Sequence, residues 1–127
     1  MKPAQAYLAI RIAMMSGLLL FGGVTWFLHQ RPEWIPADDE LAGRFTMFGQ
    51  VLWGLATAAL VLLFFQHRKT ESPVKASTLS IVAWSVGEAL AIFGAVHFYL
   101  TGVSTWYVSG LIGMSITFVA FKPPALR

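Results

Sequence analysis

The sequence predicts an all-α, polytopic membrane protein with four transmembrane helices and both termini in the cytoplasm. The first observation behind this prediction is composition: of 127 residues, 57% are hydrophobic and 12% are charged, and the mean hydropathy is +0.66. Soluble domains carry about 25% charged residues, so this chain has too few to cover a water-facing surface. The other two observations are four apolar runs and the basic residues that flank alternate ends of those runs. The length fits a single four-helix transmembrane domain over residues 1–127.

The first apolar run covers residues 8–28. Because Arg11 lies one turn inside its start, the uncharged part is 12–28, near the lower limit of about 17–25 residues for a span. We expect the long Arg11 side chain to extend back to the lipid headgroups, as basic side chains near helix ends do. Signal peptides also combine a charged start with an apolar run, but no small-x-small cleavage site follows Phe27, so we expect this segment to remain.

A polar segment, residues 29–44, separates the first run from the second. Pro32 and Pro36 are expected to break any helix there. Asp38 fits the N-cap position of the next helix, and Asp39 and Glu40 would then lie in its positively polarised first turn.

Three further apolar runs complete the predicted bundle. They cover residues 45–65, 79–100 and 103–121, and a basic loop follows the first of them. Lys122 and the Pro123-Pro124 pair are expected to end the last helix.

The distribution of charge predicts the topology. Most basic residues fall in the N-terminus, the loop after residue 65 and the C-terminus, whereas the polar segment 29–44 is rich in acidic residues; the basic residues are Lys2, Arg68, Lys69, Lys75, Lys122 and Arg127. By the positive-inside rule these three regions are cytoplasmic. Several aromatic residues suit the outer interfacial belt: Trp26, Trp34, Tyr99, Trp106 and Tyr107.

Small residues at a spacing of four predict how the helices pack, since helices in lipid associate where small side chains let the backbones approach. The third run has the longest such stripe, made by Ala83, Gly87, Ala91 and Ala95, which predicts that this helix is central. Shorter stripes occur in the other runs: Ala9, Ala13 and Gly17; Gly54 and Ala58; Ser109, Gly113 and Thr117.

Glu88 lies at the middle of the third run, with ten or more uncharged residues on either side. A charged residue at the bilayer centre costs roughly 2.5–3.5 kcal/mol on insertion scales, and such residues are usually functional or buried against a partner. Glu88 is therefore either a reversible ion-binding site or a structural carboxyl that is hydrogen-bonded to a neighbour. Mirroring the second and third runs about their loop places Thr57 at the depth of Glu88, as its expected hydrogen-bonding neighbour, and Gln50 nearer the outer face as a weaker candidate.

Residues 68–96, RKTESPVKASTLSIVAWSVGEALAIFGAV, resemble the ion-binding hairpin of the ring-forming proteolipid (subunit c) of rotary ATP synthases. In that family a cytoplasmic loop with an Arg precedes a helix that carries the ion-binding carboxylate, followed by Ala-Leu, a small residue, Ile, an aromatic residue and Gly. Here Glu88 is followed by ALAIFG, and Arg68, Glu71 and Lys75 fall at a family-like spacing. The resemblance implies that Glu88 binds H⁺ or Na⁺.

The second run departs from that family, because FTMFGQVLWGLATAALVLLFF lacks the proteolipid's alternating glycines, and two further helices flank the hairpin. The whole chain also looks like small four-span bacterial membrane proteins that share this Glu-containing segment.

Histidines offer a third interpretation. His29 and His97 both fall near the outer ends of their runs, where they could bracket a haem or a metal ion. His67 is expected to be a solvated loop residue. The chain has no cysteine, which excludes disulfides, Cys-based zinc sites and iron–sulfur clusters, and we expect no covalently bound cofactor.

The favoured functional prediction is a small non-catalytic subunit of the bacterial inner membrane. No phosphate-binding loop, nucleophile–base pair or metal motif occurs in the sequence, so we expect no enzymatic activity. Its expected role is accessory, in the assembly of a larger and possibly energy-converting membrane complex. The expected partners are lipid and other membrane subunits or further copies of this chain, and not nucleic acid. Ion translocation through Glu88 and cofactor binding through His29 and His97 are the two alternatives.

Overall fold

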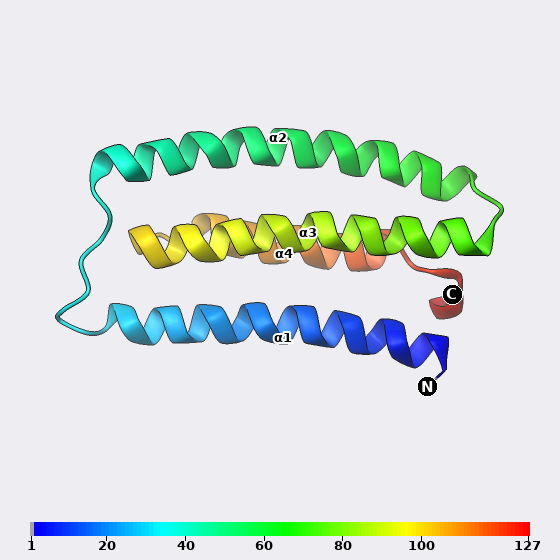
Figure 1. Ribbon diagram of the computed structural model, residues 1–127, viewed down its shortest axis with the longest axis horizontal. Coiled ribbons are helices and arrows are strands. Elements are labelled where there is room, and N and C mark those ends of the chain that lie inside the picture. Colours follow the sequence, from blue (N-terminus) through cyan, green and yellow to red (C-terminus); the bar gives the residue numbers. More distant parts are fainter. Residues whose placement is uncertain (1) are drawn as a thin grey trace.

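The computed structural model describes residues 2–127, and 84% of the chain is helical, with no strand among the described residues. The all-α fold class is therefore confirmed. The elements are α1 (Pro3–His29), α2 (Asp39–Lys69), α3 (Pro73–Thr101), α4 (Thr105–Ala120) and the short 3-10 helix η1 (Pro124–Leu126), shown in Figure 1.

Three of the helices, α1, α2 and α3, are long and apolar enough to cross a membrane. They extend beyond the predicted runs 8–28, 45–65 and 79–100 at both ends. Hydropathy marks the part of a helix that suits lipid, whereas the backbone hydrogen bonds continue into the polar flanks until a cap or a proline stops them.

The fourth helix is shorter than predicted. The run 103–121 contains a helix of only 16 residues, which is about 24 Å long at 1.5 Å per residue. Gly102 ends α3 in the left-handed conformation, with φ of 78°, and donates its N–H to the carbonyl of Phe98. The chain turns there before α4 begins, and the Pro123-Pro124 pair prevents α4 from continuing.

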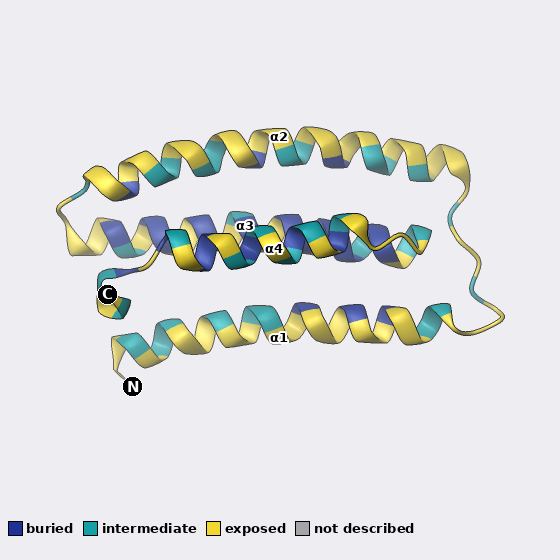
Figure 2. Cartoon of the chain, turned by 180° about the vertical axis from the view of Figure 1, so that it is seen from behind, coloured by how far each residue is buried: buried dark blue, intermediate teal, exposed yellow. Residues whose placement is uncertain are grey.

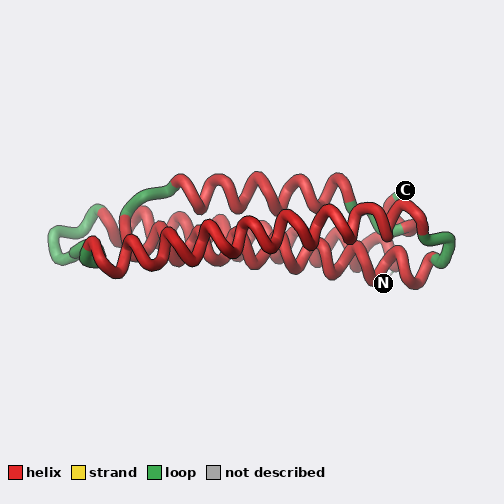
Figure 3. The backbone as a smooth tube through the Cα atoms, turned by 90° about the horizontal axis from the view of Figure 1, so that it is seen from above, coloured by secondary structure: helices red, strands yellow, loops and turns green. Residues whose placement is uncertain are grey.

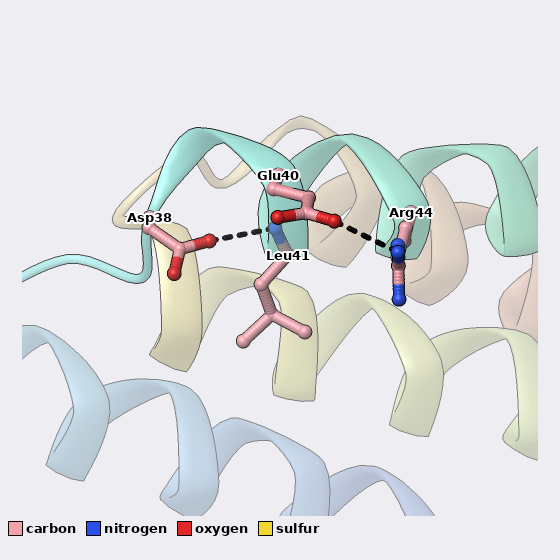
Figure 4. Close-up of polar contacts among 4 residues, drawn as sticks. All are labelled: Asp38, Glu40, Leu41 and Arg44. Atoms are coloured by element: carbon pink, nitrogen blue, oxygen red, sulfur yellow. Dashed lines mark hydrogen bonds and ion pairs between the residues drawn. The ribbon is translucent and has the colours of Figure 1, made fainter.

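The start of α2 confirms the predicted N-cap. The Asp38 carboxylate accepts a hydrogen bond of 2.8 Å from the backbone N–H of Leu41, and Glu40 forms an exposed ion pair of 2.8 Å with Arg44 (Figure 4). Residues 30–38, which hold both predicted helix-breaking prolines, form the non-helical connection before it. Helix α3 begins in a similar way, because Ser72 caps it and Pro73 occupies its first position.

Helix α3 lies at the centre of the molecule, between α1 and α2, and α4 packs along it (Figure 1). The most extensive contact is between α3 and α4, followed by α2 with α3 and then α1 with α3. All connecting loops lie at the two ends of the helices (Figure 3). The N- and C-termini lie at the same end, together with the connection between α2 and α3 (Figure 1).

Burial is concentrated on α3, whereas α1 and α2 are exposed over most of their surface (Figure 2). Backbones approach closely between α3 and α4: a Cβ atom added at Gly110 would lie 2.6 Å from Cα of Ala91, and one at Gly87 would lie 2.9 Å from Cα of Met114. By contrast, a Cβ added at Gly17 or Gly54 would meet nothing within 4 Å. The bundle is thus a tight α3–α4 pair with two loosely attached flanking helices.

Candidate functional site

Glu88 lies on the face of α3 that is turned towards α1. It is half-buried and lines a groove of about 250 Å³ between the two helices. The other side chains that line this groove are apolar; they include Met14, Leu18, Phe21 and Ile92. Among residues 2–127, no hydrogen bond or ion pair is formed by the Glu88 carboxyl group. Glu88 is therefore a polar group in an apolar groove, with no hydrogen-bonding partner in the part of the chain that the structure describes.

The two residues expected near Glu88 lie elsewhere, which corrects the predicted hydrogen bond between Glu88 and Thr57. Thr57 lines a different groove, between α2 and α4, and Gln50 is exposed on α2. The mirrored hairpin gave the depth of Thr57 along the helix axis, but depth does not fix the rotation of a helix. Glu88 is turned towards α1, whereas α2 lies on the other side of α3 (Figure 1).

The four residues of the predicted α3 stripe are buried: Ala83 and Ala91 have no exposed surface, Ala95 is 2% exposed, and Gly87 is also buried. Gly87 and Ala91 face α4: Gly87 lies against Met114 and Thr117, and Ala91 lies against Gly110. Ala95 instead lines the groove beside Glu88.

Small residues of α1 also border the Glu88 groove. Ala13 and Gly17, two members of the predicted α1 stripe, line it, and both are exposed. Because a Cβ at Gly17 would meet nothing within 4 Å, α1 is open at this position among the described residues. The groove thus combines one unpaired carboxyl group with small residues that a further helix could approach closely.

The two candidate cofactor ligands belong to different contacts. His29 lies 3.0 Å from the backbone carbonyl of Tyr99 through its Nε2 atom, and its ring packs on Trp34 with a centroid distance of 3.9 Å. These contacts are part of the α1–α3 interface and the connection 30–38.

His97 is buried in the α2–α3 interface. Its Nε2 atom is 3.3 Å from the hydroxyl of Thr46, and its Nδ1 atom is 3.4 Å from the hydroxyl of Thr101. The rings of Phe45 and Trp106 lie beside it. The structure does not bring His29 and His97 to one cavity, and the described residues contain no group of three or more His, Cys, Asp or Glu that could hold a metal ion.

Arg11 points into the bundle, which corrects the expectation that it reaches the lipid headgroups. Its guanidinium group lies 4.7 Å from the ring centroid of Trp84 and donates a hydrogen bond to the backbone carbonyl of Phe118. It therefore links α1 to both α3 and α4, and the cation is held by aromatic faces and a carbonyl in place of headgroups. The sequence does not reveal this role, because the position of Arg11 near a helix end does not say which way α1 is rotated about its axis.

His67 is also buried, at 5% exposure, and not solvated as expected. Its Nε2 atom lies 3.0 Å from the Ser80 hydroxyl and accepts from the Arg127 guanidinium at 3.4 Å. The ring packs against Phe121, which follows α4. Phe121 and Arg127, both beyond α4, thus reach this end of α2, a contact between distant parts of the chain that the loop composition does not reveal.

Tyr107 corrects one further expectation, since it is buried and not part of an interfacial belt. Its hydroxyl donates a hydrogen bond of 2.6 Å to the backbone carbonyl of Leu18 in α1. Gly22 makes this possible, because a Cβ at that position would occupy the space of the Tyr107 hydroxyl.

No protein-family model matches this chain, and no match was found among the curated proteins or the solved structures.

Proposed function

We propose that the protein is a small non-catalytic subunit of a bacterial inner-membrane complex, and that the Glu88 groove is where it binds a neighbouring membrane helix. The observation that carries this proposal is the half-buried Glu88 carboxyl group, which lines an apolar groove and has no hydrogen-bonding partner among residues 2–127. An unpaired polar group inside a bilayer is costly, so a partner that supplies a hydrogen-bond donor there is stabilised.

The borders of the groove support helix binding. Polar side chains and small residues are the two features that associate helices in lipid, and here Glu88 lies beside Ala13 and Gly17. The expected occupant is a transmembrane helix, from another subunit or a second copy of this chain, that presents Ser, Thr, Asn, Gln or a basic side chain to Glu88.

The test compares matched substitutions on both sides of the groove. Gly17→Leu fills the approach to Glu88, whereas Gly23→Leu adds the same side chain to α1 at an equally open position that does not line the groove. We expect Gly17→Leu and Glu88→Leu to reduce the size of the native complex in mild detergent, measured by cross-linking and native electrophoresis. Gly23→Leu and Glu88→Gln should leave the size unchanged, because Gln retains a donor and an acceptor. A complex of unchanged size in both Leu variants of the groove would overturn the proposal.

The second candidate function is reversible proton binding by Glu88. It is favoured by the half-buried position of the carboxyl group and by the groove, which opens towards the exposed face of α1. Sodium fits less well than a proton, since hard cations take several oxygen ligands and the side chains around Glu88 supply no others.

Proton binding predicts a different result for one variant. Glu88→Gln would abolish proton transfer in reconstituted vesicles while the complex stays intact. Carbodiimide labelling of Glu88 should be slow and should accelerate on acidification. Absence of labelling at every pH would remove this candidate and leave helix binding.

The proposed topology has four spans, with α4 as the fourth, and both termini in the cytoplasm. It is supported by the shared end at which the termini and the α2–α3 connection lie, since that end also holds most of the basic residues (Figure 1). Reporter fusions after Gln30 and after Lys69 should report opposite sides of the membrane, the second one cytoplasmic. A periplasmic signal after Lys69 would invert the assignment.

A further inference from the structure

A basic cleft lies at the end of the molecule that holds both termini. It has a volume of about 470 Å³ and is bordered by the end of α2, the end of α4 and the C-terminal segment. Three cationic side chains line it, those of Arg68, Lys122 and Arg127, together with the imidazole of His67, which accepts a hydrogen bond from Arg127. No residue that lines this cleft also lines the Glu88 groove, so the cleft has no part in the proposed helix contact there.

The cations of this cleft have no carboxylate partner among the described residues. The only ion pair within residues 2–127 joins Arg44 and Glu40, at the opposite end of α2. Arg68 lies 5.5 Å above the ring of Phe64, and Arg127 donates to the imidazole of His67 and to the carbonyl of Lys122. A main-chain carboxylate at the last residue would offset only one positive charge. The cleft is therefore a concentrated positive site that suits an anion with several oxygen acceptors.

Two apolar grooves lead away from the cleft, one on each side of α4. The groove between α1 and α4 has a volume of about 500 Å³ and shares Val119 and Ala120 with the cleft. The groove between α2 and α4 has a volume of about 460 Å³ and shares Phe64 with the cleft. Ile116 on α4 borders both grooves, so α4 stands between them.

The packing of α4 explains why both grooves exist. Its extensive contact is with α3, and its contacts with α1 are limited to a few residues, so most of its two flanks borders the grooves towards α1 and α2. The side chains on these flanks, such as Ile112, Ile116 and Val119, are exposed. An occupant of both grooves and the cleft needs an anionic head and two apolar chains.

We propose that this region is a binding site for an anionic phospholipid, with the phosphate in the basic cleft and one acyl chain on each side of α4. A basic pocket at the ends of membrane helices is at the depth of lipid headgroups, where attraction between Lys or Arg and anionic lipid adds to the burial of the acyl chains. The two apolar grooves favour this ligand over a free phosphate, because phosphate has no apolar chain to bury in them.

The test uses the full chain in mild detergent and measures bound lipid by native mass spectrometry and the melting temperature by tryptophan fluorescence. The added probes are phosphatidylglycerol, phosphatidylcholine and inorganic phosphate. We expect phosphatidylglycerol to bind and to raise the melting temperature, and the other two probes to have little effect. Equal effects of phosphatidylcholine would show binding without recognition of charge, and equal effects of inorganic phosphate would show a plain anion site; either result overturns the proposal.

Matched variants locate the binding. Combined Arg68→Gln, Lys122→Gln and Arg127→Gln should weaken phosphatidylglycerol binding by about ten-fold or more, because each cation near an anionic lipid adds to the attraction. Lys69→Gln removes the same charge from the neighbouring residue of α2, which does not line the cleft, and should leave binding intact. Arg127→Lys keeps the charge and should retain most of the affinity. A loss of affinity in this variant would show that Arg127 acts through its hydrogen bonds to His67 and Lys122, and not through its charge.

A final variant tests the grooves. Ser115→Phe, on the groove between α1 and α4, should reduce phosphatidylglycerol binding while all basic residues remain. Full binding by this variant, or by the triple Gln variant, would overturn the two-chain site.

Discussion

The contact of α3 with α4 and the contacts of α3 with α1 and α2 are built in different ways. Between α3 and α4, backbone atoms meet: a Cβ at Gly94 would lie 2.6 Å from Cα of Tyr107, and one at Gly110 equally close to Cα of Ala91. Towards α1 and α2, long side chains bridge a wider gap. The guanidinium of Arg11 lies 4.7 Å from the ring of Trp84, and Phe45 stacks on Phe93 at 5.2 Å.

The difference shows that a small residue brings two helices together where it faces the backbone of its neighbour. Gly87 of α3 faces the backbone of α4 at Met114, and Gly110 of α4 faces the backbone of α3 at Ala91. In the stripes of α1 and α2, by contrast, Gly17 and Gly54 face no atom within 4 Å. Gly17 and Gly54 are therefore available for contacts outside this chain.

The largest effect is expected from adding a single methyl group at the tight contact. Gly110→Ala should lower the free energy of unfolding by about 1–3 kcal/mol, because the methyl group would overlap the backbone of α3. Gly54→Ala adds the same group at an open position and should raise stability by about 0.5–1 kcal/mol through helix propensity. Denaturation in detergent micelles, followed by tryptophan fluorescence, measures both. Similar free energies of unfolding for the two variants would show that the α3–α4 contact is no tighter than the open face of α2.

The next largest effect concerns the attachment of α1. Arg11→Ala removes the contact with Trp84 and the hydrogen bond to Phe118, and should lower the free energy of unfolding by about 1–2 kcal/mol. Arg31→Ala is the control, because that guanidinium lies over the exposed ring of Phe27, and it should change stability by about 0.5 kcal/mol or less. The same unfolding assay applies. If Arg11→Ala changes the free energy of unfolding no more than Arg31→Ala does, Arg11 contributes nothing to the attachment of α1.

The smallest effect on stability is expected from removing the hydroxyl group of Tyr107 while its ring is kept. Tyr107→Phe keeps the ring but loses the hydrogen bond to the carbonyl of Leu18, at a cost of about 0.5–1.5 kcal/mol. Tyr99→Phe removes a hydroxyl from a ring that is 43% exposed and should have almost no effect. Amide exchange of α1 should increase in the first variant and stay unchanged in the second. An unaltered exchange pattern in Tyr107→Phe would mean that the hydroxyl does not hold α1.

The helices themselves could be predicted because each depends on a local pattern. Four apolar runs gave four helices, and Asp38 marked the start of α2 through its own side chain. The boundaries were harder to predict, since apolar composition says where lipid is tolerated and not where backbone hydrogen bonding ends. The first three helices are longer than their apolar runs, whereas the last is shorter than its run 103–121. The turn at Gly102 and the prolines after residue 122 limit it to Thr105–Ala120.

The site could be predicted only in part, because the sequence gives depth but not rotation. Glu88 was identified from its depth alone, yet its groove is formed with α1 and not with Thr57 of α2. Arg11 and His67 were assigned to lipid headgroups and solvent, and both are turned inward by contacts with residues more than ten positions away. Such contacts depend on how whole helices are rotated against each other, which no local pattern in one sequence specifies.

The central place of α3 has a consequence for the order in which the chain can assemble during synthesis. Helices α1 and α2 emerge first, but they flank α3 on opposite sides and share no extensive contact with each other. Helices α1 and α2 therefore have no helix to pack against until the ribosome has synthesised α3. We expect α1 and α2 to remain independent in the bilayer until α3 arrives between them, and the final structure to form late, when α4 closes onto the small-residue face of α3.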